Sequence, residues 1–388
     1  MTIDDRYIDH RITQGDMITS VSGRQARNHE GRVVPERAPE SNSRFSRPAD
    51  RWLRPGSYGL ALIAETGGSY TDFAPYVPSI NDHGSVAFQA GLEGGGTGIF
   101  TSNGGSAVAA FRTDAGTHRG VCSHPDTDDG GAAACYVELT DGSRVVVIVT
   151  NGVATTMALD AGPLGPTMNR DGSLAYRTDG SGKAAIVVIR HGELETIAQV
   201  GPRFSGFQGL PVLNDRGQVA FRADLRGGGE GIYLNDGASR HAVVETGEAF
   251  AELGRFPVLS DAGAVAFCGR LTDGRSGVFV ADQDGIEMAI DSTGPFESFR
   301  GVLFAEDERL VFYGTPRGGD LGVYAGPDPG PDRILGVGTA LFGSSAQELA
   351  LNPVSINGLG QLAVRVALRD GRQTIIRADT TAHVSPAP

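Results

Sequence analysis

One phrase recurs along this chain and restricts its fold more than any other feature. It reads Pro, two residues, Asn or Ser, Asp, one residue, Gly, one residue and Val-Ala-Phe, at residues 78–88, 211–221 and 257–267. Weaker copies lie at 129–135, 168–176, 306–312 and 357–364. The turn residues of the seven copies lie 41 to 52 residues apart, a period typical of β-propeller blades; they are Gly84, Gly131, Gly172, Gly217, Gly263, Glu308 and Gly360.

Each repeat unit divides into four short strands. The Asn-Asp-x-Gly segment predicts a tight turn, because Asn and Asp tolerate the left-handed region and Gly supplies a positive φ. The Val-Ala-Phe strand returns from this turn, and in the first unit a Gly-rich loop at 94–98 and a polar turn at 103–105 bound two further strands. The strands are apolar at nearly every position, which indicates that both faces of each sheet are covered by neighbouring blades.

The two ends of the repeat predict how the ring closes. Residues 60–68 match the fourth strand of other units, such as 242–247, yet they precede the first unit, whereas the last unit has only three strands and ends near Ile376. We therefore expect an all-β, seven-bladed β-propeller in which the N-terminal strand completes the last blade and removes the free sheet edges. The expected organisation is an N-terminal arm at 1–54, disordered or extended, a propeller at 55–380 and a short tail at 381–388.

Composition supports this architecture and narrows the partners. Gly (57) and Pro (20) make up about a fifth of the 388 residues, as expected for many short strands and turns. No apolar stretch is long enough for a membrane-spanning helix and the start resembles no signal peptide, so we expect a cytoplasmic protein. The net charge is −13, and Lys183 is the only lysine. This balance argues against a nucleic acid or an anionic membrane as the main partner.

The repeated phrase resembles the bacterial NxxGxxAF tandem-repeat family over roughly residues 58–380. The first, fourth and fifth units match well, whereas the second has lost the Asn and the aromatic residue, and the sixth has Glu308 in place of Gly. The resemblance implies a β-propeller. It implies no catalytic residue, because the shared positions are turn and core residues.

The loops that lead into the innermost strand of each blade are the most varied part of each unit, and they gather on one face of a propeller. They carry aromatic residues together with arginines, whose planar guanidinium binds carboxylates or phosphates and stacks on rings. This mixture predicts a site for an anionic or aromatic small molecule. An alternative is that the aromatics fill the rim between blades and pair with the arginines. The candidate ligand-binding residues are Arg119, Arg203, Phe207, Arg255, Phe256, Phe299 and Arg300.

Two pairs on the same loops are candidates for proton transfer. Asp114 and His118 form the best general-base pair, because a carboxylate can orient an imidazole. Tyr70 and Asp72 are a second pair. We expect His83, in an Asn-Asp-x-Gly turn, to lie on the opposite face in solvent.

The second unit departs most from the repeat and brings His118, Cys122 and His124 close together in sequence. Nitrogen and sulfur ligands at this spacing can hold zinc, but the usual zinc spacings are absent, so no metal site is assigned. The acidic run at 126–130 lacks the distal Glu of a calcium loop. The glycine-rich loops at 94–98 and 227–231 do not continue as phosphate-binding loops, and no cofactor is expected.

Two hypotheses about function follow. In the leading one, the lead-in loops bind a small organic molecule, and a cofactor-free cyclase, lyase or alkyl-transfer reaction would use Arg, Tyr, His and carboxylates. In the alternative, the propeller is a non-catalytic protein-interaction platform. The fold alone does not decide between them, because propellers serve many functions.

Overall fold

A computed structural model describes residues 51–53, 57–179, 183–305 and 308–381. Everything below concerns the unit Ser46–Pro388. The predicted arm therefore lies outside the described residues except for 51–53, and so does the predicted tail after Thr381. Within the described part, no helix could span a membrane.

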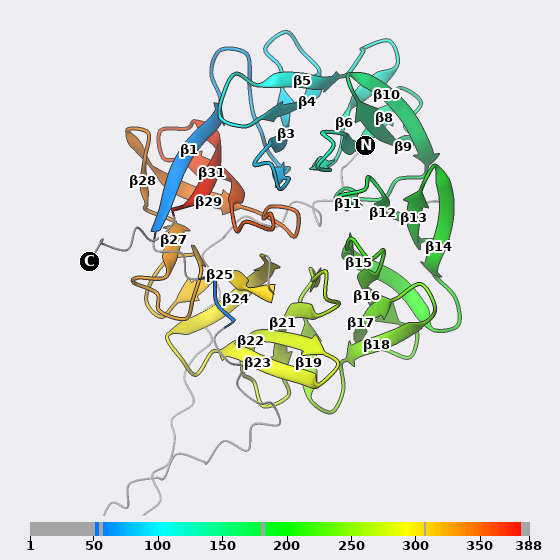
Figure 1. The fold of residues 1–388 in the computed structure, drawn as a ribbon, viewed down its shortest axis with the longest axis vertical. Helices are drawn as coiled ribbons and strands as arrows, with labels where there is room; N and C mark the ends of the chain where they lie inside the picture. The colour runs from blue at the N-terminus through cyan, green and yellow to red at the C-terminus, as the bar shows by residue number, and fades with distance from the viewer. Residues whose placement is uncertain (1–50, 54–56, 180–182, 306–307, 382–388) are drawn as a thin grey trace, which may run out of the picture. The chain divides into compact units, whose positions relative to one another are not determined.

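The described residues contain no α-helix and form seven antiparallel sheets that follow one another in chain order around a centre (Figure 1). This arrangement confirms the seven-bladed propeller. Blade 1 comprises β2 (Ser79–Ile80), β3 (Val86–Gly91), β4 (Thr97–Ser102) and β5 (Val108–Arg112); blade 2 comprises β6 (His118–Val121), β7 (Asp126–Thr127), β8 (Ala133–Leu139), β9 (Arg144–Thr150) and β10 (Val153–Leu159); blade 3 comprises β11 (Thr167–Met168), β12 (Leu174–Thr178), β13 (Ala185–Arg190) and β14 (Glu193–Gln199).

The remaining blades repeat the plan, and blade 7 begins with a short β28 that forms a hairpin with β29. Blade 4 comprises β15 (Phe204–Leu213), β16 (Val219–Leu225), β17 (Glu230–Asn235) and β18 (Arg240–Glu245); blade 5 comprises β19 (Phe250–Leu253), β20 (Val258–Leu259), β21 (Val265–Leu271), β22 (Ser276–Asp282) and β23 (Gly285–Asp291); blade 6 comprises β24 (Phe296–Phe304), β25 (Leu310–Pro316), β26 (Gly322–Tyr324) and β27 (Arg333–Gly336); blade 7 comprises β28 (Ala340–Leu341), β29 (Ser344–Ala350), β30 (Leu362–Leu368), β31 (Gln373–Thr381) and β1 (Ser57–Glu65).

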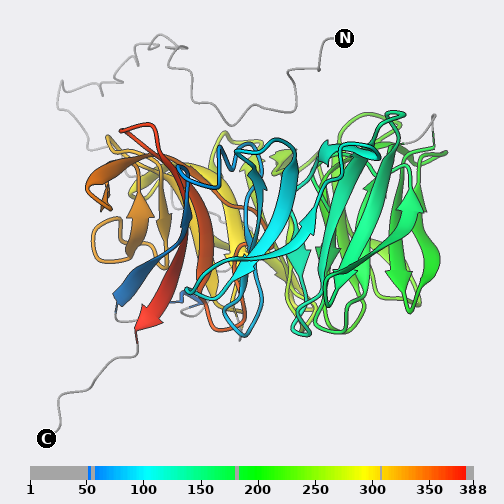
Figure 2. The same ribbon diagram turned by 90° about the horizontal axis from the view of Figure 1, so that it is seen from above.

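The N-terminal strand closes the ring, as predicted. β1 pairs antiparallel with β31 from Ser57 opposite Thr381 to Glu65 opposite Thr374, with one irregularity between Leu62 and Ala64. The two strands run side by side at the outer edge of blade 7 (Figure 2). Closure thus joins the first and last described strands.

The aromatic residue of the Val-Ala-Phe strand anchors each well-matched blade. Phe221 stacks on Tyr233 of the third strand with ring centroids 5.6 Å apart, and Phe267 stacks on Phe279 at the same distance. A phenylalanine from the innermost strand meets this pair edge-on, as Phe204 meets Tyr233 at 4.9 Å. Burial of such rings stabilises these blades.

Hairpins alternate between the two ends of the ring. The turns between first and second strands gather at one end, called the turn side, and the lead-in loops gather at the other, called the lead-in side. Gly84, Gly217 and Gly360 have φ of 74°, 75° and 76°, which explains the glycine of the repeat. In blade 6 Glu308 has a φ of 58° at the corresponding turn.

Candidate functional site

The first residue of each Asn-Asp-x-Gly turn holds the turn together. The side-chain oxygen of Asn81 accepts a hydrogen bond from the backbone N–H of Ser85 (2.9 Å), and Asn214 accepts one from Gln218 (2.9 Å). In blade 5, Ser260 replaces Asn, and its Oγ accepts the N–H of Ala264 (2.9 Å). The repeat therefore selects a short side-chain acceptor here.

The same asparagines also tie neighbouring blades together. Each Nδ2 donates to the backbone carbonyl of the corresponding residue in the next blade: Asn81 to Asp128 (2.9 Å), Asn214 to Ser260 (2.8 Å) and, across the closure, Asn357 to Asn81 (2.8 Å). The repeated Asn is thus a structural residue on the turn side.

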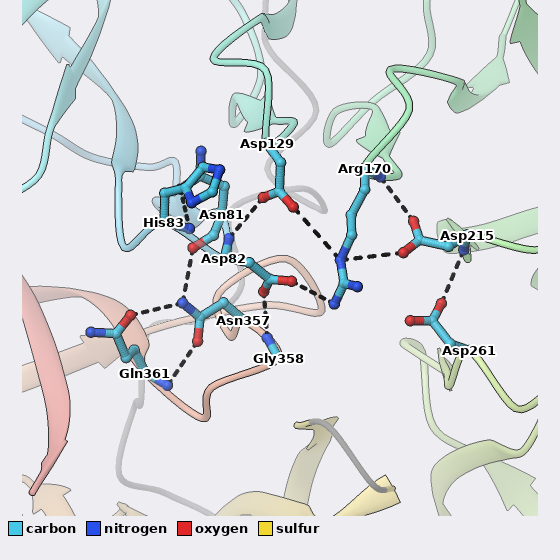
Figure 3. Close-up of polar contacts among 10 residues, drawn as sticks. All are labelled: Asn81, Asp82, His83, Asp129, Arg170, Asp215, Asp261, Asn357, Gly358 and Gln361. Atoms are coloured by element: carbon cyan, nitrogen blue, oxygen red, sulfur yellow. Dashed lines mark hydrogen bonds and ion pairs between the residues drawn. The ribbon is translucent and has the colours of Figure 1, made fainter.

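The second turn residue makes a similar set of contacts between blades, and in these contacts the acceptor is a charged carboxylate (Figure 3). The backbone N–H of Asp82 donates to Oδ1 of Asp129 (2.9 Å), and that of Asp215 donates to Oδ1 of Asp261 (3.0 Å). The N–H of Gly358 donates to Oδ1 of Asp82 (2.7 Å). Each carboxylate that bonds to the preceding blade also contributes a negative charge near the centre of the ring.

Arg170 stands where blades 1, 2, 4 and 5 have an aspartate. Its guanidinium lies among three of these carboxylates, with Nη2 2.5 Å from Oδ2 of Asp82 and Nε 3.2 Å from Oδ2 of Asp215 and 3.7 Å from Oδ2 of Asp129 (Figure 3). Partial burial lowers the pKa of Arg170, but the surrounding aspartates outweigh it and raise that pKa. Arg170 is therefore a fixed cation within an acidic ring.

These residues surround a cavity of about 460 Å³, called here the turn-side cavity, to which all seven blades contribute. Arg170 is the only basic side chain among the described residues that line it. Main-chain turns and apolar residues such as Val258 and Ile356 complete the wall. The acidic lining residues are Asp82, Asp126, Asp128, Asp129, Asp215, Asp261 and Glu308.

Burial and neighbouring carboxylates both raise the pKa of acids in this cavity. Burial raises the pKa of Asp215, and the neighbouring Asp261 raises it further. Burial also raises the pKa of Asp128, with an added contribution from Asp129. Like charges at short range disfavour ionisation, so these raised pKa values reflect the crowding of carboxyl groups as well as their burial.

Asp126 is the most perturbed acid in this cavity, and it has a structural role. Its Oδ1 accepts the N–H of Thr127 (2.9 Å), and its Oδ2 accepts the N–H of Met168 in the next blade (2.6 Å). Full burial raises its pKa to about 7. At the same strand position, the hydroxyls of Thr167 and Ser355 bond to the next blade as donors instead, to Pro211 O (2.8 Å) and Pro78 O (2.9 Å).

The predicted pair Asp114 and His118 is adjacent, but its geometry differs from the expected one. His118 Nδ1 accepts a hydrogen bond from the backbone N–H of Asp114 (3.0 Å). The carboxylate of Asp114 instead accepts from the N–H of Gly116 (2.9 Å) and the hydroxyl of Thr117 (3.4 Å). The main chain, not the carboxylate, orients this imidazole.

In the other predicted pair, Tyr70 and Asp72 each contact different residues. The Tyr70 ring packs against Phe73 and Phe100 at centroid distances of 5.6 and 5.0 Å, and burial raises its pKa. Oδ2 of Asp72 accepts a hydrogen bond from the Thr71 hydroxyl (3.2 Å). Tyr70 also borders a second, shallower pocket on the lead-in side.

Two of the predicted ligand-binding arginines hold acidic residues of their own blade. Arg119 pairs with Glu138 (3.0 Å), and Arg203 pairs with Glu245 and donates to the Tyr233 hydroxyl (3.1 Å). Arg255 and Arg300 are exposed.

The predicted aromatic residues take part in packing. Phe207 is buried in the core between blades 3 and 4. Phe256 is half-buried, and half-buried Phe299 lies against Phe296 and Phe312. None of the seven predicted ligand-binding residues lines the turn-side cavity.

The candidate metal ligands of blade 2 are separated by their environments. His124 is buried, its Nε2 lies 3.0 Å from Pro166 O, and burial lowers its pKa to about 4. Burial raises the pKa of the Cys122 thiol to about 11. Across residues 51–53 and the described parts of 57–381, no three His, Cys, Asp or Glu side chains are placed to hold a metal ion.

Sequence reasoning missed the turn-side residues, although a signal was present. The second turn position is Asp in four units and Arg170 in the third. That reversal of charge within the repeat marked Arg170, whose side chain reaches Asp82, Asp129 and Asp215.

Solved structures with similar architecture include an oligogalacturonate lyase from Vibrio parahaemolyticus, at 12% identity and a TM-score of 0.50, covering 84% of this chain and 99% of that one. An oligogalacturonate lyase in complex with manganese matches at 11% identity and a TM-score of 0.49, over 84% and 98% of the two chains. A chain of a mitotic checkpoint complex matches at 13% and 0.45, over 87% and 98%. At these identities the similarity concerns the fold alone.

No curated protein matches this chain in sequence. A family model described as "Family of unknown function (DUF7453)" matches residues 53–254. The match covers more than half of the chain and includes blades 1 to 4. No comparison bears on the resemblance to the NxxGxxAF repeat family, which stays a prediction.

Proposed function

Since this chain belongs to the family of unknown function DUF7453, which assigns it no substrate, we propose from its own side chains that the propeller binds an organic cation in the turn-side cavity. The observation that carries the proposal is the charge of this cavity. Seven carboxyl groups line it, against one guanidinium among its described residues.

Electrostatics favours a positively charged ligand here. The raised pKa values of Asp128 and Asp215 mean that ionising these groups costs free energy in the free protein. A cation near them lowers that cost, because an opposite charge within a few ångströms favours the ionised form. Anions such as the carboxylate ligands expected at the lead-in loops would be repelled from this cavity.

The arrangement of the acids suits an organic cation better than a metal ion. The carboxylates come from several blades around the wall, and the three that converge, Asp82, Asp129 and Asp215, already surround the Arg170 guanidinium. No three His, Cys, Asp or Glu side chains among the described residues are placed to hold a metal ion. A cavity of about 460 Å³ is large enough for a small molecule. Ammonium or guanidinium groups on a flexible chain can reach several separated carboxylates, as the Arg170 side chain already does.

This proposal keeps the small-molecule class of ligand expected from the sequence but moves its site and reverses its charge. On the lead-in side, Arg119 and Arg203 already pair with Glu138 and Glu245, so their guanidinium groups are less available to bind an anion. The similarity to an oligogalacturonate lyase adds no reaction, because 12% identity supports the fold only. The proposed function is binding, without a catalytic step.

Calorimetric titration with the linear triamine spermidine at pH 7 and low salt tests the proposal. The wild-type protein should bind it saturably, and Asp261→Asn should weaken binding about tenfold, or ~1.4 kcal/mol. Asparagine keeps the oxygen that accepts the Asp215 N–H, so the ring contact survives. Asp320→Asn, an exposed site on the lead-in side, is the matched charge control. Absence of saturable binding, or equal losses in both variants, contradicts the proposal.

A further inference from the structure

Residues 51–53 form a short clasp on blade 6, ahead of the closing strand β1. Trp52 makes a parallel bridge with Leu310, the first residue of β25. The N–H of Leu53 donates to Leu310 O (3.2 Å), and the N–H of Leu310 donates to Arg51 O (2.7 Å). The clasp is thus anchored through its backbone to the blade beside the closure.

The side chains of the clasp reach three blades. The Trp52 ring packs against Phe312 of blade 6, with centroids 5.4 Å apart. Leu53 lies against Gly360 of blade 7 so closely that a Cβ there would be 2.5 Å from its Cδ2. Arg51 pairs with Asp282 of blade 5 (3.0 Å).

Glu308 connects the clasp to the turn-side cavity. Its Oε2 lies 3.1 Å from Arg51 Nη1, and its Oε1 accepts a hydrogen bond from the Ser260 hydroxyl (2.8 Å). Glu308 and Ser260 both line the cavity. One carboxylate therefore belongs to the acidic wall and to the clasp at the same time.

We infer that residues 51–53 are a releasable clasp and that the Arg51 guanidinium competes with a cation in the turn-side cavity for Glu308. This inference rests on the proposed function. A cation in the cavity attracts Glu308 and repels Arg51, so ligand binding weakens the clasp. By linkage, releasing the clasp strengthens ligand binding by the same factor.

Trp52 makes the clasp directly observable, because it is the only tryptophan of the chain. Arg51→Gln removes the ion pairs to Asp282, Glu287 and Glu308 but keeps the backbone contacts of the clasp. In this variant, without any ligand, Trp52 emission should move to longer wavelength and acrylamide quenching should rise. Arg226→Gln is the matched charge control, since Arg226 lies in a lead-in-side hairpin and donates to Gly201 O (2.8 Å).

The second measurement is the spermidine titration of the full chain. We expect Arg51→Gln to bind about fivefold more tightly than the wild type, at the low end of measured couplings, and Arg226→Gln to match the wild type. Spermidine should also shift Trp52 emission of the wild type to longer wavelength.

Three results would overturn the inference, and they are distinguishable. Unchanged Trp52 emission in Arg51→Gln means that Arg51 does not hold the clasp. Shifted emission with unchanged spermidine affinity means that the clasp and the cavity are not coupled, while the proposed function stands. No spermidine binding by either protein removes the proposed function and the coupling together.

Discussion

The backbone N–H of Asp215 donates a hydrogen bond to Oδ1 of Asp261, the residue at the same turn position one blade further around the ring (3.0 Å). The carboxylate that joins two blades is therefore also a charge on the wall of the turn-side cavity. The contact between blades and the proposed ligand binding both use the Asp261 carboxylate, but they depend on different properties of this group. Ring stability needs an acceptor oxygen, whereas cation binding needs the negative charge.

Substitutions at Asp261 should separate the two properties. Asp261→Ala removes the acceptor for the Asp215 N–H and should lower the free energy of unfolding by about 1 kcal/mol. Asp261→Asn keeps an acceptor oxygen and should remain close to the wild type. Urea denaturation measures both values, and a destabilisation of Asn as large as that of Ala would contradict this role of the oxygen.

Arg170→Gln should make the turn-side cavity more acidic. Without the guanidinium, Asp82, Asp129 and Asp215 repel one another, so the melting temperature should fall, and the fall should be smaller in high salt. The backbone N–H that donates to Asp215 is kept. Spermidine affinity should rise in the same variant. Melting curves at two salt concentrations test the first point, and a fall that is independent of salt would contradict it.

Asp126 should make the stability depend on pH. Because its folded-state pKa is about 7 and the ordinary value is 3.8, the folded protein holds a proton that the unfolded chain has released between these values. The free energy of unfolding should therefore decrease as pH rises from about 4 to 7.

Asp126→Asn should remove this contribution and make the dependence on pH less negative over that window. His124 acts in the opposite direction, since its lowered pKa makes the folded protein less stable as pH falls from 6.5 toward 4. Denaturation of the wild type and of Asp126→Asn at several pH values isolates the carboxyl group. Parallel curves for the two proteins would contradict the assignment.

The repeat and the closure were predictable because their causes are local. The turns at Gly84 and Gly217 need a residue with left-handed backbone, which favours glycine. The apolar pattern of 60–68 matches that of a fourth strand, whichever blade the segment joins. The site was harder to predict because the directions of side chains depend on the closed ring. Asp261 and Arg170 lie in turns that look solvated in sequence, and only the meeting of seven blades places them around one cavity.

The lead-in loops illustrate the same difficulty from the other side. Phe207 and Arg203 occur in a variable loop, where an aromatic ring beside a guanidinium group suggests a ligand site. In the structure, Phe207 fills the space between blades, and Arg203 pairs with Glu245. Sequence alone does not distinguish an aromatic residue that packs from one that binds.

Truncation tests the closure. Removing residues 1–50 should leave the melting temperature nearly unchanged, whereas removing 1–68 should collapse it, because the second truncation deletes β1 and exposes the edge of β31. Calorimetry of both truncated proteins gives the comparison. Equal effects of the two truncations would contradict closure by β1.

A crystal structure of the protein grown with spermidine tests directly whether the turn-side cavity binds an organic cation. We expect electron density in the turn-side cavity, with ammonium groups within hydrogen-bond distance of at least two of Asp82, Asp129, Asp215 and Asp261. Density on the lead-in side instead, or an empty turn-side cavity in a protein that binds spermidine in solution, would contradict the proposal.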